Sequence, residues 1–424
     1  MNILMLGRWL PPPRRPVRDT REYQFGRYLA RDHQLTVAFV TDNADATGAI
    51  SALRKEFTDI EFAVMPRTWK SLEAAVRAAT GESCTLSYAR SGALRTRIED
   101  RIRRSDYDLV FVLSSSMIQY VLDLNPAIPV VMDFAGVDSE WWLAQAARGP
   151  YPATRFFNTE ASRLRLAEAA VARRAAWCVA ESAAAETIVR SLVPDAKTAV
   201  VPSGVDVELF AGPTRENKTR TVVLRTSSLG SDQDLREAEQ FCRHVIPRVR
   251  ARIPEARIVL ASGDPIPTPR AARLLGAEVV APVTDPRQFF HSQAAAVGLF
   301  GSGNDLRRRV LEPMAAGIPV IVGTKAIEQL GIEDKQAVCR ADGPADIAQA
   351  VIQLLEDPIR RIEFGERGKA YVTANAAWSV MAERLAGIIQ RAAQGSPAVV
   401  RPPVKKGGSR PVSAFPPSAV EGGR

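Results

Sequence analysis

Two successive series of short apolar strands, each strand followed by a helical stretch, constrain the fold of this chain more than any other feature. The strands expected in the first series are residues 2–6, 35–41, 61–65, 109–113, 130–134 and 199–201. Those expected in the second are residues 221–224, 257–261, 278–281, 295–300, 319–322 and 337–340. The clearest helical patterns between them are residues 22–31, 93–104, 161–176, 235–252, 305–316 and 345–355. Continuous apolar strands separated by helices predict parallel sheets with helices on both faces.

The length of 424 residues exceeds what one hydrophobic core usually holds, so we expect two domains. A Pro-Ser-Gly turn at 202–204 marks their boundary, which predicts doubly wound domains over residues 1–205 and 206–378. We expect a helix at residues 379–393 to pack back on the first domain. Residues 394–424, rich in Pro, Gly and Ser, are expected to form a disordered basic tail. Ligands of such sheets bind outside the carboxyl ends of the strands, so the two domains should face a central cleft.

The net charge of +9 does not by itself indicate a nucleic-acid-binding protein. Residues 395–424 carry five basic residues against one acidic residue, so the folded part is only mildly basic. This distribution favours anionic small molecules, or peripheral contact with an anionic membrane face, over nucleic acid.

Metal and membrane signals are weak in this sequence. The four cysteines and three histidines are scattered and form no zinc-ligand spacing, so we expect no metal and no other cofactor. The N-terminal apolar run has the character of a buried strand rather than a signal peptide, and no apolar run is long enough to span a bilayer. We therefore expect a cytoplasmic protein, with peripheral contact at the inner membrane.

The segment 301–323 is the most informative part of the chain for chemistry. A Gly-rich loop leads from a buried strand into a helix that Asn304 or Asp305 could cap, and Gly317 supplies the stop.

Three arginines and one glutamate stand out on that helix: Arg307, Arg308, Arg309 and Glu312. We expect the arginines in the first turn, where the helix dipole disfavours cations, so their placement indicates a bound anion such as a phosphate. Glu312 lies one turn further on the same face, where its carboxylate could accept hydrogen bonds from a ribose diol. The alternative, a solvated face with pairs four residues apart, stays equally open on the residues alone.

Three motifs in order resemble those of the retaining GT-B glycosyltransferases of family four. They are Asp-Phe-Ala-Gly-Val-Asp-Ser-Glu at 133–140, Val-Pro-Ser-Gly-Val-Asp at 201–206, and Glu-Pro-Met-Ala-Ala-Gly-Ile-Pro-Val at 312–320. The first motif is most similar to the sugar transferases associated with bacterial PEP-CTERM/exosortase exopolysaccharide systems. The likeness runs from the first strand to about Trp378.

This resemblance implies two Rossmann-like domains and transfer of a hexose, with retained configuration, from a nucleoside diphosphate sugar to a glycan or polyprenyl-linked acceptor. It implies an acceptor role for the first domain and nucleotide-sugar binding for the second, in exopolysaccharide or cell-envelope biosynthesis. By the resemblance, Glu312 binds the donor ribose and Arg309 the diphosphate. The full set that it implies is, for the donor, Arg307, Arg308, Arg309, Glu312 and Ser227; for catalysis, Asp138 and Ser139; and at the cleft mouth, Arg21.

Some positions depart from the family pattern and motivate other hypotheses. Ser227 stands where a glycine is expected beside the diphosphate, and Gly136 and Val17 also differ. The second hypothesis is therefore a catalytically weakened GT-B scaffold protein in the same pathway. A nucleotide-sugar epimerase-like enzyme is the third, although its chemistry needs acid and base side chains that the scattered histidines do not supply.

Overall fold

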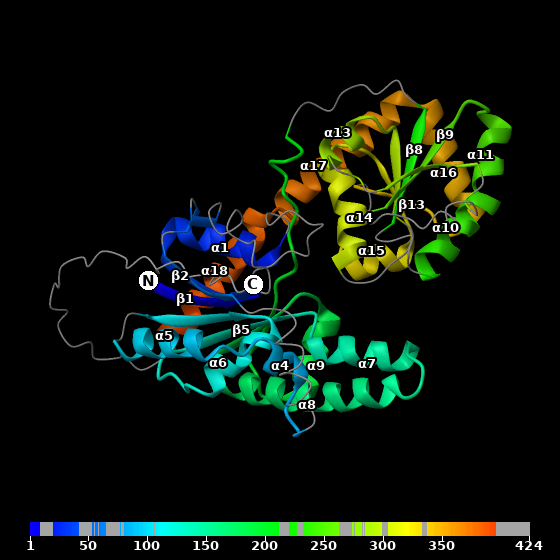
Figure 1. Cartoon of the computed structure of the whole chain (residues 1–424). Helices are drawn as coiled ribbons and strands as arrows, with labels where there is room; N and C mark the ends of the chain where they lie inside the picture. The colour runs from blue at the N-terminus through cyan, green and yellow to red at the C-terminus, as the bar shows by residue number, and fades with distance from the viewer. Residues whose placement is uncertain are drawn as a thin grey trace, which may run out of the picture.

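A computed structural model shows two α/β domains joined by two short connections (Figure 1). The described residues are 1–8, 20–41, 53–54, 56–57, 59–64, 77, 80–104, 107–211, 220–226, 232–262, 274, 276–281, 283, 285–298, 304–332 and 337–395. Two positions named above, Val17 and Ser227, lie outside the described residues, and so does the tail from residue 396.

The N-terminal sheet is parallel throughout and has the strand order β3-β2-β1-β4-β5-β6-β7. Its strands are β1 (Asn2–Gly7), β2 (Gln34–Thr41), β3 (Asp59–Val64), β4 (Leu109–Leu113), β5 (Val130–Ala135), β6 (Trp177–Ala180) and β7 (Thr198–Val200). β1 pairs with β2 on one side and β4 on the other, so the chain winds outward in both directions from this central strand. Strand β6 is an addition to the predicted set.

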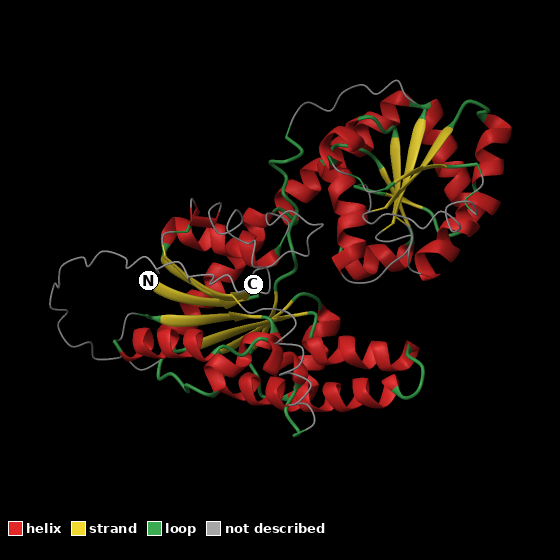
Figure 2. Ribbon diagram, viewed as in Figure 1, coloured by secondary structure: helices red, strands yellow, loops and turns green. Residues whose placement is uncertain are grey.

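Helices cover both faces of this sheet (Figure 2). On one face the core includes residues of α1 (Arg21–Asp32) and α18 (Trp378–Gln394). On the other it includes residues of α5 (Gly92–Arg103), α6 (Ile118–Leu122), α8 (Ala153–Arg174) and α9 (Ala183–Leu192). The remaining described elements are α4 (Cys84–Tyr88), the 3-10 helix η2 (Ser115–Met117) and α7 (Asp138–Arg148).

The C-terminal sheet is also parallel, with the order β10-β9-β8-β11-β12-β13. Its strands are β8 (Thr221–Thr226), β9 (Arg257–Ser262), β10 (Glu278–Val280), β11 (Ala295–Gly298), β12 (Val320–Val322) and β13 (Cys339–Arg340). Its helices are α10 (Asp232–His244), α11 (Ile246–Arg252), α13 (Pro286–His291), α14 (Asn304–Ala315), α15 (Thr324–Leu330), α16 (Pro344–Glu356) and α17 (Pro358–Asn375). The prediction of two doubly wound parallel-sheet domains is confirmed.

One helix prediction in this domain is wrong. The pattern at residues 235–252 forms two helices, α10 and α11, which meet at Val245. Pro247 lies in the first turn of α11, where its missing N–H and fixed φ are tolerated, whereas inside one long helix it would remove a hydrogen bond.

The two connections between the domains lie side by side. Val205 forms a parallel bridge with Ala377, and its N–H donates to the carbonyl oxygen of Ala376 at 2.8 Å. A Cβ atom on Gly204 would come within 2.6 Å of the Cα atom of Trp378, so only glycine allows this close approach. Trp378 packs edge-on against Phe25 at 5.5 Å between ring centroids, which places it in the N-terminal domain rather than at the end of the second domain. Helix α18 then continues on that domain, through to Gln394.

Candidate functional site

Polar side chains gather at the carboxyl ends of the strands in both domains. In the N-terminal domain the centre is an ion pair between Arg21, the first residue of α1, and Asp133 near the end of β5. The Arg21 Nε atom donates to Asp133 Oδ2 at 2.8 Å, and a second guanidinium nitrogen donates to the carbonyl oxygen of Val201 at 2.7 Å. Burial raises the pKa of the Asp133 carboxyl, and the Arg21 charge opposes that shift. Arg21 thus lies inside the domain, tied to the segment that enters the interdomain connection.

Two further carboxylates add negative charge beside this pair. Glu181 follows β6 and is buried, and Glu22 follows Arg21 in the first turn of α1. Burial raises the pKa of Glu22 to about 7, and the negative charges of Asp133 and Glu181 add to the shift. A group that titrates near neutral pH therefore lies next to Arg21.

The residues before α7 have an unusual backbone. Ala135 and Val137 have φ angles of 48° and 57°, in the left-handed region that non-glycine residues rarely adopt, so this turn is strained. The turn brings Asp138 to the first position of α7, where the N–H of Ser115 donates a hydrogen bond to its carboxylate. Burial raises the pKa of Asp138. Val137 is the N-cap residue of the helix.

Ser139, which the family resemblance assigns to catalysis, lies inside the N-terminal domain. Ser139 is fully buried, and its hydroxyl donates to Glu168 Oε2 at 2.5 Å while its N–H donates to Glu168 Oε1 at 3.2 Å. Ser115 donates to the same Oε1 atom at 2.8 Å. The buried Glu168 carboxylate therefore joins α7, η2 and α8, and Ser139 holds the start of α7 in place.

In the C-terminal domain the three arginines of α14 point to three different partners. The helix begins at Asn304, so Arg307 is its fourth residue and the arginines extend beyond its first turn. Asn304 and Asp305 are likewise inside the helix rather than before it. The helix dipole therefore disfavours these arginines less than their expected place in the first turn implies.

Arg309 points into the domain. Its exposed fraction is 4%, and it donates to Asp234 Oδ2 of α10 at 2.8 Å. This buried ion pair joins α14 to α10, so Arg309 acts as a positioning residue here, and the predicted direct contact with the diphosphate is not what this geometry supports.

Arg307 points toward the other domain. Its Nε atom donates to the carbonyl oxygen of Ser203, in the interdomain connection, at 3.0 Å. Burial lowers the pKa of Arg307, and the negative charge of Glu181 opposes this shift, whereas the positive charges of Arg21 and Arg384 add to it. The charges of Arg21 and Glu181, in the N-terminal domain, therefore act on Arg307 across the domain boundary; we call these three residues the interdomain site.

Arg308 and Arg225 hold Glu312. The Nε atom of Arg308 donates to Glu312 Oε1 at 2.8 Å, and Arg225, near the carboxyl end of β8, donates to Oε2. The Arg225 guanidinium also lies 5.3 Å from the ring centroid of Phe290. We call Arg225, Arg308 and Glu312 the Glu312 cluster. A carboxylate offers about four lone-pair sites, so these two contacts do not use all of its acceptor capacity.

The structure thus distributes the predicted site residues over distinct places. Arg21 and Arg307 lie at the interdomain site, Arg308 and Glu312 form a cluster, and Ser139 and Arg309 are buried inside their domains. Asp138 lies on the N-terminal domain, at the strained turn.

Sequence reasoning missed four functional candidates: Arg225, Asp133, Glu181 and Glu168. Arg225 had a detectable signal, because it interrupts an otherwise apolar strand, where charged residues are rare unless they are paired. Glu168 had none, because a glutamate in a long helix is typical of a solvated face. Within the described ranges, no group of three or more His, Cys, Asp or Glu residues has the arrangement of a metal site. None of the helices in the described part combines the length and apolar character of a membrane span.

The second domain contains the part of the chain that matches a known protein family. Residues 220–357 match the family model for group 1 glycosyl transferases, a range that contains the whole Glu312 cluster. Over 212 residues the chain is 28% identical to a GDP-mannose-dependent monoacylated alpha-(1-6)-phosphatidylinositol monomannoside mannosyltransferase of Corynebacterium glutamicum. That stretch covers 45% of this chain and 55% of the relative, so the chain spans about half the length of this curated relative.

Solved structures match over both domains. Sucrose-phosphate synthase from Thermosynechococcus elongatus aligns with a TM-score of 0.61 at 13% identity, covering 92% of this chain and 99% of that one. Anabaena HepE, solved in complex with UDP, aligns with a TM-score of 0.60 at 15% identity, covering 92% and 100%. The chain has the GT-B fold. In this GT-B protein, the Rossmann-like domains expected from the sequence motifs are both present.

Proposed function

We propose that this GT-B protein is a glycosyltransferase that moves a hexose from a nucleoside diphosphate sugar to a glycan or polyprenyl-linked acceptor, in exopolysaccharide or cell-envelope synthesis. One observation carries the proposal: a carboxylate, Glu312, is held by two guanidinium groups near the carboxyl edge of the second sheet, inside the range that matches group 1 glycosyl transferases. Ligands of doubly wound sheets bind at this edge. The mannosyltransferase relative uses GDP-mannose and HepE binds UDP, which supports a nucleotide-sugar donor without choosing the base.

In the proposed reaction the bond between the anomeric carbon and the diphosphate oxygen breaks, and the acceptor oxygen forms the new bond. The acceptor proton passes to the departing diphosphate, and the sugar keeps its anomeric configuration. Negative charge grows on the diphosphate as the bond breaks, and the Arg225 and Arg308 guanidinium groups stabilise charge at that position. Glu312 accepts hydrogen bonds from the donor ribose. Because guanidinium groups supply the positive charge, we propose that no metal takes part, and activity should survive EDTA.

Donor binding tests this proposal directly. Purified protein is titrated with GDP-, UDP- and ADP-sugars by calorimetry, and Glu312→Gln is compared with Glu328→Gln, a control at an exposed glutamate of α15. We expect one nucleotide sugar to bind, and Glu312→Gln to weaken its binding at least about tenfold through lost charge-assisted hydrogen bonds, while Glu328→Gln does not. Absence of binding by every nucleotide sugar would favour the scaffold hypothesis instead.

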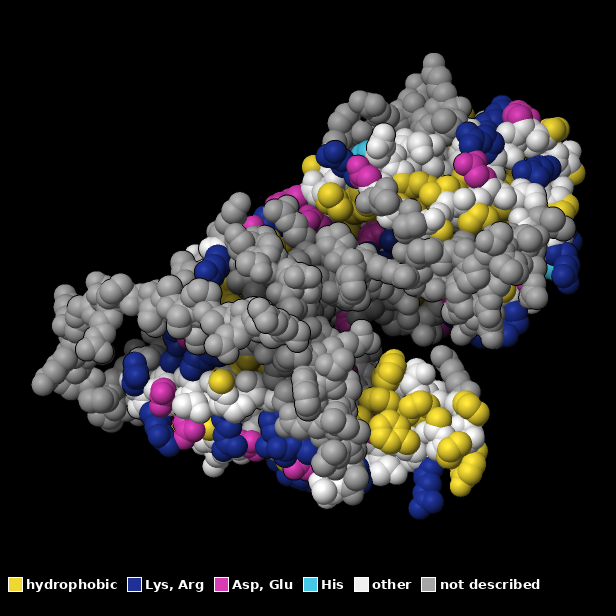
Figure 3. Space-filling model, viewed as in Figure 1, with side chains coloured by type: hydrophobic (Ala, Val, Ile, Leu, Met, Phe, Trp, Pro, Cys, Tyr) yellow, Lys and Arg dark blue, Asp and Glu magenta, His cyan; other side chains and the backbone are white. Residues whose placement is uncertain are grey.

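A second observation favours a membrane-bound acceptor. Helices α7 and α8 form a hairpin that carries a group of apolar side chains on its surface (Figure 3). Trp141 is 56% exposed and Phe156 46%, and Trp142 links them through edge-on ring contacts. Exposed Arg155 precedes Phe156 on the same helix. Aromatic rings beside arginine are typical of surfaces that enter the interface of an anionic bilayer, so we propose that this hairpin contacts the membrane that carries the acceptor.

Vesicle binding tests this part. Co-sedimentation with vesicles containing phosphatidylglycerol is measured for Trp141→Gln and for Ile359→Gln, a control at a 72% exposed residue of α17. We expect binding by the native protein that only Trp141→Gln weakens. Equal losses in both variants, or no vesicle binding by the native protein, would contradict membrane contact through the hairpin.

A further inference from the structure

The buried carboxylate of Glu168, on α8, connects the two turns that surround Asp138. Its Oε1 atom accepts from the Ser115 hydroxyl at 2.8 Å and from the Ser139 N–H at 3.2 Å, and its Oε2 atom accepts from the Ser139 hydroxyl at 2.5 Å. Ser115 begins η2, after β4, and Ser139 is the second residue of α7, after β5. Because β4 and β5 are neighbouring parallel strands, Glu168 joins two adjacent turns at the carboxyl edge of the first sheet.

Both serines that bind Glu168 also fix the position of Asp138. Ser139 is the next residue in α7, and the Ser115 N–H donates to the Asp138 carboxylate. Ser115 thus contacts Glu168 through its hydroxyl and Asp138 through its N–H. Glu168 is fully buried, whereas Asp138 is only partly buried. Asp138, rather than Glu168, is therefore the carboxylate that a ligand at this edge of the sheet can contact.

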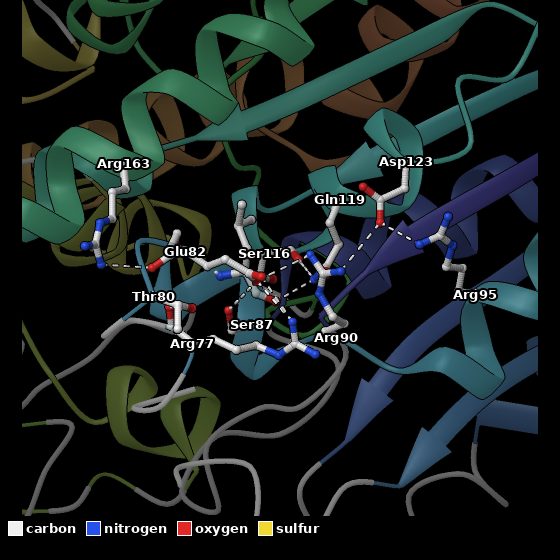
Figure 4. A network of polar contacts seen from close by, with 12 residues as sticks. Arg77, Thr80, Glu82, Ser87, Arg90, Arg95, Ser116, Gln119, Asp123 and Arg163 are labelled. Atoms are coloured by element: carbon white, nitrogen blue, oxygen red, sulfur yellow. Dashed lines mark hydrogen bonds and ion pairs between the residues drawn. The ribbon is translucent and has the colours of Figure 1, made fainter. Parts of the chain in front are cut away.

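Both turns have a strained backbone. Ser114, the residue before η2, has a φ angle of 80°, in the same left-handed region as the two strained residues before α7. Strain of this kind persists only where the surroundings fix it, and it is commonest at functional sites. On the side of η2, Gln119 of α6 also donates to the carbonyl oxygen of Ser116, at 3.0 Å (Figure 4). Hydrogen bonds from α8 and from α6 therefore hold the strained turns that carry Asp138.

We propose that Glu168 is a positioning residue of the transferase, which holds the Asp138 carboxylate where a sugar hydroxyl can donate to it. The family resemblance assigns Asp138 to catalysis, so this inference rests on the proposed function. A hydrogen bond from a hydroxyl to a carboxylate is charge-assisted and depends on distance and angle. A displacement of about 1 Å in a reacting site can lower a rate about a hundredfold. Glu168 thus acts on the reaction through Asp138, without touching the substrate.

Glu160 provides a matched control on the same helix. It is 1% exposed, and it accepts from the Ser83 hydroxyl at 2.6 Å and from the N–H groups of the next two residues at 2.8 and 2.9 Å. Like Glu168, it is a buried carboxylate with three donors. These donors lie at the start of α4, however, and none of them is adjacent to Asp138 in the chain.

The titration of Asp138 tests the inference without a transfer reaction. Burial raises the pKa of this carboxyl above its ordinary 3.8, and the positive charge of Arg8, after β1, opposes the shift. Glu168 is the other charged group described beside it. The pKa is measured by ¹³C NMR on protein labelled at aspartate, with the signal assigned from Asp138→Asn.

The three glutamate variants should differ in this titration. Glu168→Ala releases both serines, so we expect Asp138 to become more exposed and its pKa to fall toward 3.8. Glu168→Gln keeps an acceptor oxygen for them, so the pKa of Asp138 should stay raised. Glu160→Ala should leave that pKa at its native value. If Glu168→Ala does not fold, Ser139→Ala takes its place, because the lost hydroxyl donates to Glu168.

Turnover separates a positioning role from a merely structural one. Release of nucleoside diphosphate from GDP-mannose, UDP-glucose and ADP-glucose is measured with water as the acceptor, below the unfolding midpoint of each variant. We expect Glu168→Ala to lower kcat about a hundredfold with an unchanged donor Kd, and Glu168→Gln and Glu160→Ala to stay within about threefold of native. In an Asp138→Asn background, Glu168→Ala should cause little further loss, because the residue through which it acts is already changed.

Three results would overturn the inference: an unchanged pKa of Asp138 in the folded variant, equal losses of turnover in Glu168→Ala and Glu160→Ala, or additive losses with Asp138→Asn. Donor binding, measured on the same samples, separates this failure from that of the proposed function. A native protein that binds and turns over a donor keeps its transferase assignment when the inference fails. A native protein that binds no donor loses the proposed function, and the inference with it.

Discussion

Replacing Arg309 by methionine separates two roles that the sequence alone could not distinguish. Arg309 was a candidate for the donor diphosphate, yet its guanidinium is buried against Asp234 at 2.8 Å. If the structural role is the main one, Arg309→Met should destabilise the second domain by about 3 to 5 kcal/mol, because it leaves the Asp234 carboxylate buried without this cation. Arg308→Met removes a half-exposed side chain and should cost under about 1 kcal/mol.

Urea unfolding measures this difference. With a slope of about 3 kcal/mol per molar urea, the Arg309→Met loss should lower the unfolding midpoint of the second domain by about 1 M or more. Far-ultraviolet circular dichroism follows the transition, and nucleotide binding at 25 °C is recorded for each variant below its midpoint. The double variant Arg309→Met, Asp234→Leu should recover much of the loss, because no buried charge of the pair then remains.

A mainly structural role for Arg309 is refuted if Arg309→Met keeps the native midpoint and loses nucleotide binding. That outcome would place the guanidinium at the phosphate rather than in the α10–α14 ion pair. It would also fail if the double variant were no more stable than the single one.

Three further predictions concern the N-terminal domain and the interdomain connections. The folded-state pKa of Glu22 is about 7, against an ordinary value of 4.5. The free energy of unfolding should therefore fall by up to about 1.4 kcal/mol per pH unit as the pH rises from about 4.5 to 7. Glu22→Gln should remove this contribution to the pH dependence, as measured by urea unfolding at several pH values. Gly204→Ala should lower the melting temperature by several degrees in a thermal-shift assay, because its Cβ meets the Trp378 backbone, whereas Gly136→Ala, with open space around it, should not. In urea unfolding, Glu168→Gln should stay within about 1 kcal/mol of native stability, because its amide can donate to the Ser139 hydroxyl. Glu168→Ala should lose several kcal/mol, because it leaves buried donors without an acceptor. A stable Glu168→Ala variant would contradict this account.

The sequence was sufficient for the architecture because strand and helix periodicity are local properties. Strand β6 was not predicted because Trp177–Ala180 follows a long alanine-rich helix, and no turn residue separates the helix from the strand. The apolar spacing is continuous over residues 235–252, so it predicted one helix. Pro247 was the sequence signal for a second helix start, and the prediction did not use it. Both errors fall at boundaries, where local pattern is least informative.

The site was harder to predict because residues adjacent in sequence on a helix point in different directions. Successive helical positions are about 100° apart, so Arg307, Arg308 and Arg309 cannot all face one ligand. Their partners, Ser203, Glu312 and Asp234, are distant in the chain and come together only through the tertiary fold. A run of three arginines therefore indicated charge near the site, while burial decided which of them can meet a substrate.

In the proposed transferase, the contact between Arg307 and Ser203 would connect donor binding to movement of the domains. Ser203 belongs to the connection in which Val205 pairs with Ala377. Ala377 lies between α17 of the second domain and α18, which packs on the first domain. A carbonyl oxygen is a weaker partner for a guanidinium group than a phosphate is, so a donor diphosphate within reach would compete for Arg307. That exchange would release a contact at the connection at the moment the donor binds. The same arginine would then sense the donor and alter the hinge, which couples occupancy of the second domain to its orientation relative to the first.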